Sequence, residues 1–486
     1  MRRADRLLLA LPIAAALAGC TLAPADKVPP TPVATQYTDP GPWVQAQPSD
    51  QLPRADWWSL YGDPQLDQLQ QRLLAKNADL AAALAHYQQA QALFREARSG
   101  YFPQIGASAG AVRQRQSDTA PMRSPTAPAD YDTYTAGAQL DYEVDLWGKV
   151  RDTVAAGRDE AQATAADLAS VQLSLQAQLA DSYLALRGLD QQLQLLQQSI
   201  DAYQKALQLT QTLHAGGIVS GLDVARAQTQ LSTVKSQWSQ TMAQREQMQD
   251  AIAVLVGESA AQFNLPAQTA AIPLPQIPLA LPSTLLQRRP DIAAAERRTA
   301  EANAEIGVAR SAYFPSLTLD AQGGFLSKRY ADLLTAPNHV WALGPSLLFD
   351  IFDGGLRKAQ VAAAKAAADE AGAKYRGVVL GAFQQVQDNL AQLDRFSAAM
   401  VDQQAASAAA QRSLDLAMKQ YKVGAASYLD VVQAQTTSLQ AQSSVLSLGT
   451  QQLRASVQLI RALGGGWSRE QLAKKPAGNG GMAAGR

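Results

Sequence analysis

A pentapeptide near the start of this sequence has the spacing of a catalytic motif. Residues Gly106 to Gly110 read G-x-S-x-G, the pattern that places a nucleophilic serine on a sharp turn between a strand and a helix. Here the pentapeptide lies inside a run expected to form a strand. The histidines that could act as its base are scattered and lack metal-ligand spacing: His86, His214 and His339. We therefore expect no enzyme activity, no cofactor and no bound metal.

Three acidic residues with a spacing of two could also do chemistry. Asp141, Glu143 and Asp145 could imitate the carboxylate cluster of a metal site or of a glycosidase. The residues between them are apolar or aromatic, and this alternation is typical of a strand with one polar and one apolar face. A solvated strand face is the simpler interpretation, and it is the one we adopt.

The first twenty residues carry a targeting signal. Arg2 and Arg3 precede an apolar stretch, Leu7 to Leu17, that is too short to span a bilayer as an ordinary helix. Leu17-Ala18-Gly19-Cys20 resembles the bacterial lipobox, in which the cysteine is lipidated and becomes the mature N-terminus. Cys20 is the only cysteine, so no intrachain disulfide can form. We predict a signal peptide over 1–19 and a lipid-anchored segment over 20–75, rather than an ordinary buried thiol at Cys20.

Composition narrows the class of protein. Lys plus Arg and Asp plus Glu each number 42, so the net charge is zero, which argues against a nucleic-acid partner. After the signal peptide, no stretch of eighteen uninterrupted apolar residues occurs, so we expect strands rather than helices to make any membrane passage.

The sequence contains two similar halves. Tyr101-Phe102-Pro103 recurs as Tyr313-Phe314-Pro315, an offset of 313 − 101 = 212. Asp223 and its neighbours recur around Asp430, with 430 − 223 = 207. We therefore predict two repeats, at 76–256 and 288–463, a proline-rich connector at 257–287 and a loose tail at 464–486.

Each repeat is predicted to run helix, strand, strand, long helix, turn, helix. The expected strands span about ten residues or more, enough to cross a membrane when tilted. The long helices, at 150–213 and 356–421, would each reach roughly 95–100 Å at 1.5 Å per residue. Apolar residues recur every seven positions in the first, which is coiled-coil spacing. The four strands are expected at 104–115, 133–145, 316–325 and 339–352.

Four strands in one chain need partners from other chains. An open sheet in lipid would leave the backbone groups of its edges unpaired, at a cost of several kcal/mol each. Two copies would give eight strands with a filled interior, whereas three would give twelve strands around a lumen. The acidic strand face, with Asp141, Glu143 and Asp145, would then line that lumen.

At this point the chain resembles the outer-membrane efflux channels of the TolC type, especially their lipoprotein branch. The resemblance covers essentially the whole mature chain and implies a mostly helical trimer: long helical hairpins form a periplasmic α-barrel, and four strands per chain form a 12-stranded membrane β-barrel. It also implies anchoring in the bacterial outer membrane, with a periplasmic adaptor and a proton-driven inner-membrane transporter as partners. The matching motifs are Asp56-Trp57-Trp58, Arg288-Arg289-Pro290-Asp291-Ile292, the two Tyr-Phe-Pro corners, Phe352-Asp353-Gly354-Gly355 and Arg461-Ala462-Leu463-Gly464-Gly465-Gly466-Trp467.

The same resemblance places a periplasmic gate at the turns after the long helices. Leu429 and Asp430 match the constricting leucine and aspartate rings of such channels, and Tyr421 matches on the partner helix. Leu222 and Asp223 are their counterparts in the first repeat. Gln433 stands where a second acidic residue is common, which puts a double acidic ring in doubt. The alternative is that both aspartates are ordinary helix-start acids favoured by the helix dipole.

The resulting functional expectation is a passive conduit for drugs or other small solutes within a tripartite efflux system. A rival interpretation is a structural coiled-coil lipoprotein or adhesin-like stalk without conduction. The long helices and the lipobox fit both, whereas the amphipathic strand pairs favour the channel.

Overall fold

The computed structural model describes residues 21–25, 30, 56–117, 119, 128–277 and 288–469. The predicted signal peptide, Cys20, the second part of the connector and most of the tail lie outside the described residues. None of the helices in the described part of the chain is long and apolar enough to cross a membrane.

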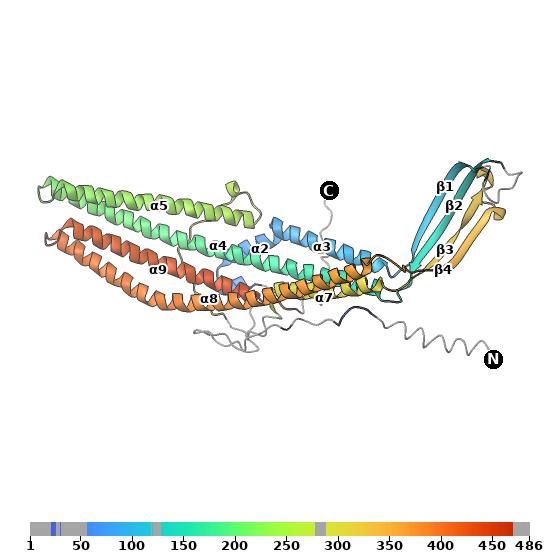
Figure 1. Ribbon diagram of the computed structural model, residues 1–486. Helices are drawn as coiled ribbons and strands as arrows, with labels where there is room; N and C mark the ends of the chain where they lie inside the picture. The colour runs from blue at the N-terminus through green and yellow to red at the C-terminus, as the bar shows by residue number, and fades with distance from the viewer. Residues whose placement is uncertain are drawn as a thin grey trace. The chain divides into compact units, whose positions relative to one another are not determined.

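Helices and strands follow the predicted order in both halves of the chain. The order α3-β1-β2-α4-α5 returns as α7-β3-β4-α8-α9 (Figure 1). The main elements are α2 (Pro64–Lys76), α3 (Ala78–Ser99), β1 (Gln104–Arg115), β2 (Asp130–Glu143), α4 (Lys149–Ala215), α5 (Gly221–Leu255), α7 (Pro290–Ser311), β3 (Ser316–Ser327), β4 (His339–Leu348), α8 (Leu356–Lys422) and α9 (Tyr428–Ala462). Short 3-10 helices are η1 (Trp57–Tyr61), η2 (Ala260–Gln262), η4 (Tyr330–Asp332) and η5 (Ala336–Asn338).

The chain divides into two compact units, and the division cuts across the two repeats. The first unit holds residues 1–29, 87–164 and 295–375, and the second holds 30–86, 165–294 and 376–486. Each unit therefore takes segments from both halves of the sequence, and the boundaries fall within α3, α4, α7 and α8.

The first unit contains one four-stranded antiparallel sheet in the order β1-β2-β3-β4. Its register aligns apolar residues of all four strands in one row and polar residues of β1, β2 and β3 in the next. One row is Ile105, Leu140, Ala321 and Leu343, and the next row is Gln104, Asp141, Asp320 and Gly344. Because successive side chains point to opposite faces of a sheet, the first row lies on an apolar face and the second on a polar face.

Two strands end earlier than predicted. β4 stops at Leu348 rather than Phe352, because Leu348 pairs with Ser316, the first residue of β3, and later residues have no partner in the ladder. β2 stops at Glu143, so Asp145 lies beyond the strand and its placement on the strand face was wrong. The carboxylate of Asp145 instead accepts hydrogen bonds from the backbone N–H groups of Val150 and Arg151 at the start of α4.

The second unit contains α5, α9 and the later parts of α4 and α8, which form two helical hairpins, α4–α5 and α8–α9 (Figure 1). Helices α4 and α8 have 67 residues each, about 100 Å at 1.5 Å per residue, as predicted. The heptad positions of α4 are buried, among them Leu186, Leu193 and Ile200. Trp57, Trp58 and Tyr61 of η1 are buried in the same unit, where the Tyr61 hydroxyl lies 2.7 Å from Ser456 Oγ.

A buried ion network ties the described part of the connector to the hairpin of α4 and α5. Asp190 on α4 accepts hydrogen bonds from Arg187 at 2.7 Å and from Arg245 at 2.6 Å. The two guanidinium groups also donate to the carbonyl oxygens of Pro266 and Leu265. The two arginines compensate the buried carboxylate, which isolated burial would make costly. The network therefore holds the connector to α4 and α5 at Leu265 and Pro266.

Candidate functional site

The turn between α4 and α5 is closed by a left-handed glycine and a capping box. Gly217 has a φ of 71°, which favours glycine because a side chain would be strained there. Ser220 then caps α5: its N–H donates to Asp223 Oδ2 at 3.3 Å, and its Oγ accepts from the Asp223 N–H at 3.3 Å. The other carboxylate oxygen of Asp223 pairs with Arg226 at 3.4 Å.

The turn between α8 and α9 is built in the same way but differs in charge. Gly424 has a φ of 76°, and Ser427 and Asp430 form the second capping box. The hydrogen bonds from the Ser427 hydroxyl and N–H hold the pKa of the Asp430 carboxyl below its usual range. Asp430 is exposed, and none of the ion pairs between described residues includes it. Its carboxylate therefore keeps an uncompensated negative charge.

The charge difference follows from one position. Adding the repeat offset to Arg226 gives 226 + 207 = 433, which is Gln433, an exposed residue. Gln433 carries no charge, so it cannot neutralise Asp430 as Arg226 neutralises Asp223. This residue was flagged from the sequence as a missing acid; the structure shows that in the first turn the same position holds a base.

The two turns also differ in their aromatic contacts. Tyr421 and Tyr428 are buried, and their rings lie 5.2 Å apart at an angle of 61°. The Tyr421 hydroxyl donates to Thr210 Oγ1 of α4 at 3.2 Å. Burial raises the pKa of Tyr428 to about 12. The pair belongs to a hydrophobic cluster with Tyr203, Val431 and other residues of α4, α5 and α9, which joins the second turn to the neighbouring hairpin.

In the first turn, a histidine and a glycine occupy the positions of that tyrosine pair. Subtracting 207 from 421 and from 428 gives His214 and Gly221. His214 is exposed, and its Nδ1 lies 2.9 Å from the carbonyl oxygen of Val219 in its own turn. A Cβ at Gly221 would meet the His214 ring at 3.8 Å, so this histidine lies against its own turn, whereas Tyr421 reaches α4.

Leu222 and Leu429 are the exposed apolar residues of the two turns. Their side chains are 58% and 50% exposed, although each precedes a helix-capping aspartate in a polar turn. The structure thus brings together the predicted residues of each turn. Tyr428, Arg226 and the capping serines were not predicted from the sequence, although the pattern S-x-x-D before a helix could have indicated both capping boxes.

The predicted acidic strand residues are placed only in part as expected. Asp141 and Glu143 lie in β2, and Asp141 is directly opposite Asp320 of β3. Glu143 pairs with Lys149 at 3.0 Å, and Ser346 donates to Asp320 at 2.8 Å. The two facing aspartates concentrate negative charge on the polar face of the sheet, because like charges directly opposite are not compensated by each other.

The described residues do not form the arrangement that a serine nucleophile or a metal site would need. The G-x-S-x-G pentapeptide lies within β1, where Ser108 pairs with Gly137 and no strand-to-helix elbow is present. The described residues include no group of three or more His, Cys, Asp or Glu side chains that could hold a metal ion.

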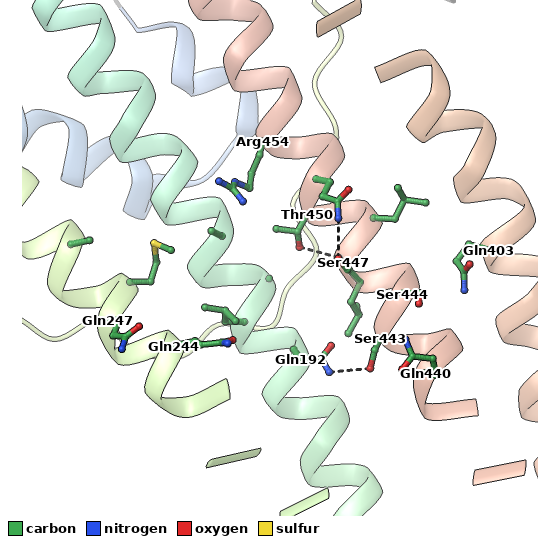
Figure 2. Close-up of a pocket in the computed structure, with 18 residues that line it drawn as sticks. Gln192, Gln244, Gln247, Gln403, Gln440, Ser443, Ser444, Ser447, Thr450 and Arg454 are labelled. Atoms are coloured by element: carbon green, nitrogen blue, oxygen red, sulfur yellow. Dashed lines mark hydrogen bonds between the residues drawn. The ribbon is translucent and has the colours of Figure 1, made fainter. Parts of the chain in front are cut away.

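A groove of about 930 Å³, lined by both polar and apolar side chains, lies among the helices of the second unit. Figure 2 shows Gln192 of α4, Gln244 of α5 and Ser443 and Thr450 of α9 around it. Gln192 donates to Ser443 at 3.0 Å. The charged group that lines the groove is Arg454, which is paired with Asp181 at 2.9 Å. The groove is therefore nearly neutral and lined by amides and hydroxyls rather than by reactive groups.

Comparisons with known proteins agree with this geometry. A family model described as Outer membrane efflux protein matches residues 69–258 and 281–465. The pyoverdine export outer membrane protein OpmQ of Pseudomonas aeruginosa is 34% identical over 470 residues, which cover 94% of this chain and 98% of that protein. The probable efflux pump outer membrane protein TtgC of Pseudomonas putida is 32% identical over 454 residues, 93% of each chain.

A solved structure shows the same fold. The structure of the outer-membrane channel OprN matches with a TM-score of 0.85 and 28% identity, and the match covers 92% of this chain and all of that one. Since the family model spans most of the sequence and two relatives exceed 30% identity over nearly its whole length, the chain belongs to the outer membrane efflux protein family.

Proposed function

We propose that this chain is the outer-membrane channel of a tripartite efflux system and passively conducts drugs or other small solutes out of the cell. Three copies form the conduit, with their strands in the outer membrane and their helical hairpins in the periplasm. A periplasmic adaptor and a proton-driven inner-membrane transporter deliver the solute. The functions named for the relatives OpmQ and TtgC, pyoverdine export and an efflux pump, support this assignment.

The observation that carries the proposal is the register of the sheet. The row of Ile105, Leu140, Ala321 and Leu343 is apolar in all four strands, yet β1 and β4 are edges without a strand partner among the described residues. Such edges are costly in lipid, and pairing β1 of one copy with β4 of the next satisfies both of them. Three copies then close twelve strands around a lumen. Asp141, Glu143 and Asp320 line that lumen in this arrangement and favour cations there.

We further propose that the hairpin turns form the periplasmic gate. Threefold symmetry brings the Leu429 side chains together near the axis, with Asp430 beside them. Apolar rings can stop ions by dewetting, and crowded carboxylates attract cations. Leu222 and Asp223 contribute from the first turn, and Tyr421 holds the second turn to α4. Both aspartates also cap their helices, so their structural role accompanies the role in the gate.

The lipid anchor is the third part of the proposal. Cys20 is acylated and attaches the mature chain to the outer membrane, where each buried methylene contributes about 0.8 kcal/mol. The strands bury more apolar surface than the acyl chains, so they provide the main anchor and the lipid assists it.

Two adjacent substitutions in β2 test the channel against a non-conducting stalk. Leu140 is on the apolar face and Gln139 on the polar face of the sheet. Leu140→Arg should destabilise the membrane-inserted trimer by about 2–4 kcal/mol if it lies near the bilayer midplane, whereas Gln139→Arg should be tolerated. The measurement is the fraction of heat-resistant trimer, followed by conductance of the purified protein in planar bilayers. Equal damage from both changes, or absence of conductance in the parent protein, would refute the channel.

A further inference from the structure

Three residues near the predicted lipidation site are bound to the first unit by specific contacts. Thr21 Oγ1 donates a hydrogen bond to Asp152 Oδ1 of α4 at 2.8 Å. Arg310 of α7 donates to the carbonyl oxygen of Leu22 at 2.9 Å. The Ala23 N–H donates to Thr21 Oγ1 at 3.2 Å, so these residues form a short turn on the surface of the two helices.

The helix surface beneath this turn has the features of a built site. The Asp152 side chain is buried, and burial raises the pKa of its carboxyl, while the hydrogen bond from Thr21 opposes that shift. The charged form of a buried carboxylate is costly unless donors reach it. Thr21 is such a donor, so removing residues 21–23 from the site would leave Asp152 less compensated.

Gly307 provides the space for the turn. A Cβ at this position would collide with Asp152 Oδ2 and would lie 2.8 Å from the Ala23 nitrogen. Gly307 lies in a regular part of α7, where glycine is less favourable than alanine. Helix geometry gives no reason for a glycine here, whereas the close approach of Asp152 and Ala23 does.

The site lies at the junction between the sheet and the helices. Asp152 is in the first turn of α4, which follows β2, and Arg310 is in the last turn of α7, which precedes β3. A residue bound here is therefore held close to the ends of the two central strands. Cys20 immediately precedes Thr21 in the sequence.

We propose that Asp152, Gly307 and Arg310 form a binding site for the residues that follow acylated Cys20, so that the lipid leaves the protein at the junction of sheet and helices. This inference rests on the proposed lipidation of Cys20. The residues after Cys20 are then held on the protein surface rather than forming a flexible linker. As a result, the acyl chains and the strands enter the membrane at the same surface. The site recognises the turn by one hydroxyl, one carbonyl oxygen and the close approach that Gly307 permits.

A spin label on the neighbouring exposed residue tests this site. The parent protein carries Ala25→Cys with a nitroxide, in outer-membrane-like vesicles, because a lipidated Cys20 has no free thiol to label. Gly307→Ala should release the turn and shorten the rotational correlation time of the label about fivefold. Thr21→Val, which keeps the shape and removes the donor, should give a smaller change of about twofold. Relaxation by oxygen and by a water-soluble nickel chelate locates the label relative to the membrane surface.

The control is Gly381→Ala, since a Cβ at this helical glycine of α8 meets nothing within 4 Å, and the label should stay as immobile as in the parent. Unchanged mobility in both Gly307→Ala and Thr21→Val would overturn the site, and if Gly307→Ala does not fold, Thr21→Val decides alone. Palmitate labelling is read in the same samples. A parent chain that is immobile but not acylated would refute the lipid assignment while leaving the bound turn in place, so the two failures are distinguishable.

Discussion

The two hairpin turns share their spacing, their left-handed glycine and their capping box, yet they differ in their aromatic contacts and in their charges. In the turn between α8 and α9, Tyr421 and Tyr428 are buried and reach Thr210 of α4. In the turn between α4 and α5, His214 contacts its own turn and remains exposed. The second turn is therefore held by a buried tyrosine pair that the first turn lacks, although Val219 of the first turn packs against the same hydrophobic cluster.

The two turns also differ in whether their aspartate has an ion-pair partner. The first turn neutralises Asp223 with Arg226, and the second leaves Asp430 free beside Gln433. The more firmly packed turn thus carries the uncompensated charge. A gate needs a charge at a defined place, and we infer that the tyrosine pair supplies the rigidity while Asp430 supplies the field.

The largest expected effect comes from removing the aromatic contact. Tyr428→Ala should destabilise the second turn by about 3–5 kcal/mol, because it leaves a cavity beside Tyr421 and Val431. His214→Ala, at an exposed position of the first turn, should change stability by less than about 0.5 kcal/mol. Hydrogen exchange of the turn amides measures both. Similar protection losses in the two variants would mean that the tyrosine pair does not anchor the second turn.

The second largest expected effect is a change in the conductance of the resting channel. Leu429→Ser should raise single-channel conductance several-fold by wetting the constriction, and Leu222→Ser should raise it less, since Gly221 leaves the first turn without the buried aromatic that precedes Leu429. Planar-bilayer recordings of the two variants against the parent provide the measurement. A larger increase from Leu222→Ser would place the narrowest point at the first turn.

Ion selectivity should respond to exchanging the charges of the turns. Gln433→Arg introduces into the second turn the partner that Asp223 already has, so cation selectivity should fall to about the level of Asp430→Ala. Arg226→Gln removes the ion-pair partner of Asp223 and should therefore increase cation selectivity. Reversal potentials in a salt gradient report the result. If Gln433→Arg and Arg226→Gln both leave selectivity unchanged, the aspartates serve only as helix caps.

The smallest effect concerns pH. Hydrogen bonds from Ser427 lower the folded pKa of Asp430, so its capping contribution is fully present above the unfolded value of about 3.9 and is lost as pH falls through the lower folded value. Cation selectivity should accordingly persist from pH 7 down to about 4. Ser427→Ala removes a donor and should move the loss of selectivity to higher pH in the same recordings, whereas Ser220→Ala should not. A loss of selectivity well above pH 4 in the parent protein would contradict the assigned hydrogen bonds.

Much of the fold was predictable because its signals are periodic and local. Alternating residues identified β2 and β3 clearly and their partner strands less cleanly, and the absence of proline from long stretches identified α4 and α8. Strand ends were less accurate: Asp145 continues the alternation of β2, but the start of α4 recruits its carboxylate as a cap. The ladder partner of each residue determines where a strand stops, and a single strand's sequence does not contain that information.

The candidate site was predicted less completely than the fold. The spacing identified Leu429 and Asp430 together with Leu222 and Asp223, because the two turns repeat one another. It did not identify Tyr428, whose counterpart is Gly221, since the two positions share no chemistry. The contact of Thr21 with Asp152 joins residues 131 positions apart, and no periodicity or motif indicates it.

The central strand pair of the sheet has a kinetic consequence. β2 ends at Glu143 and its neighbour β3 begins at Ser316, so 316 − 143 = 173 positions separate two strands that are hydrogen-bonded side by side. Pairing over such a separation is slow, because the chain loses loop-closure entropy before the stabilising contacts between the strands can form. The hairpin of β1 and β2 must therefore wait, with one edge open to aggregation, until the second half of the chain has been exported. Assembly in the membrane is consequently limited by the arrival of β3, and a chain truncated before Ser316 should reach the periplasm as a substrate for chaperones and proteases.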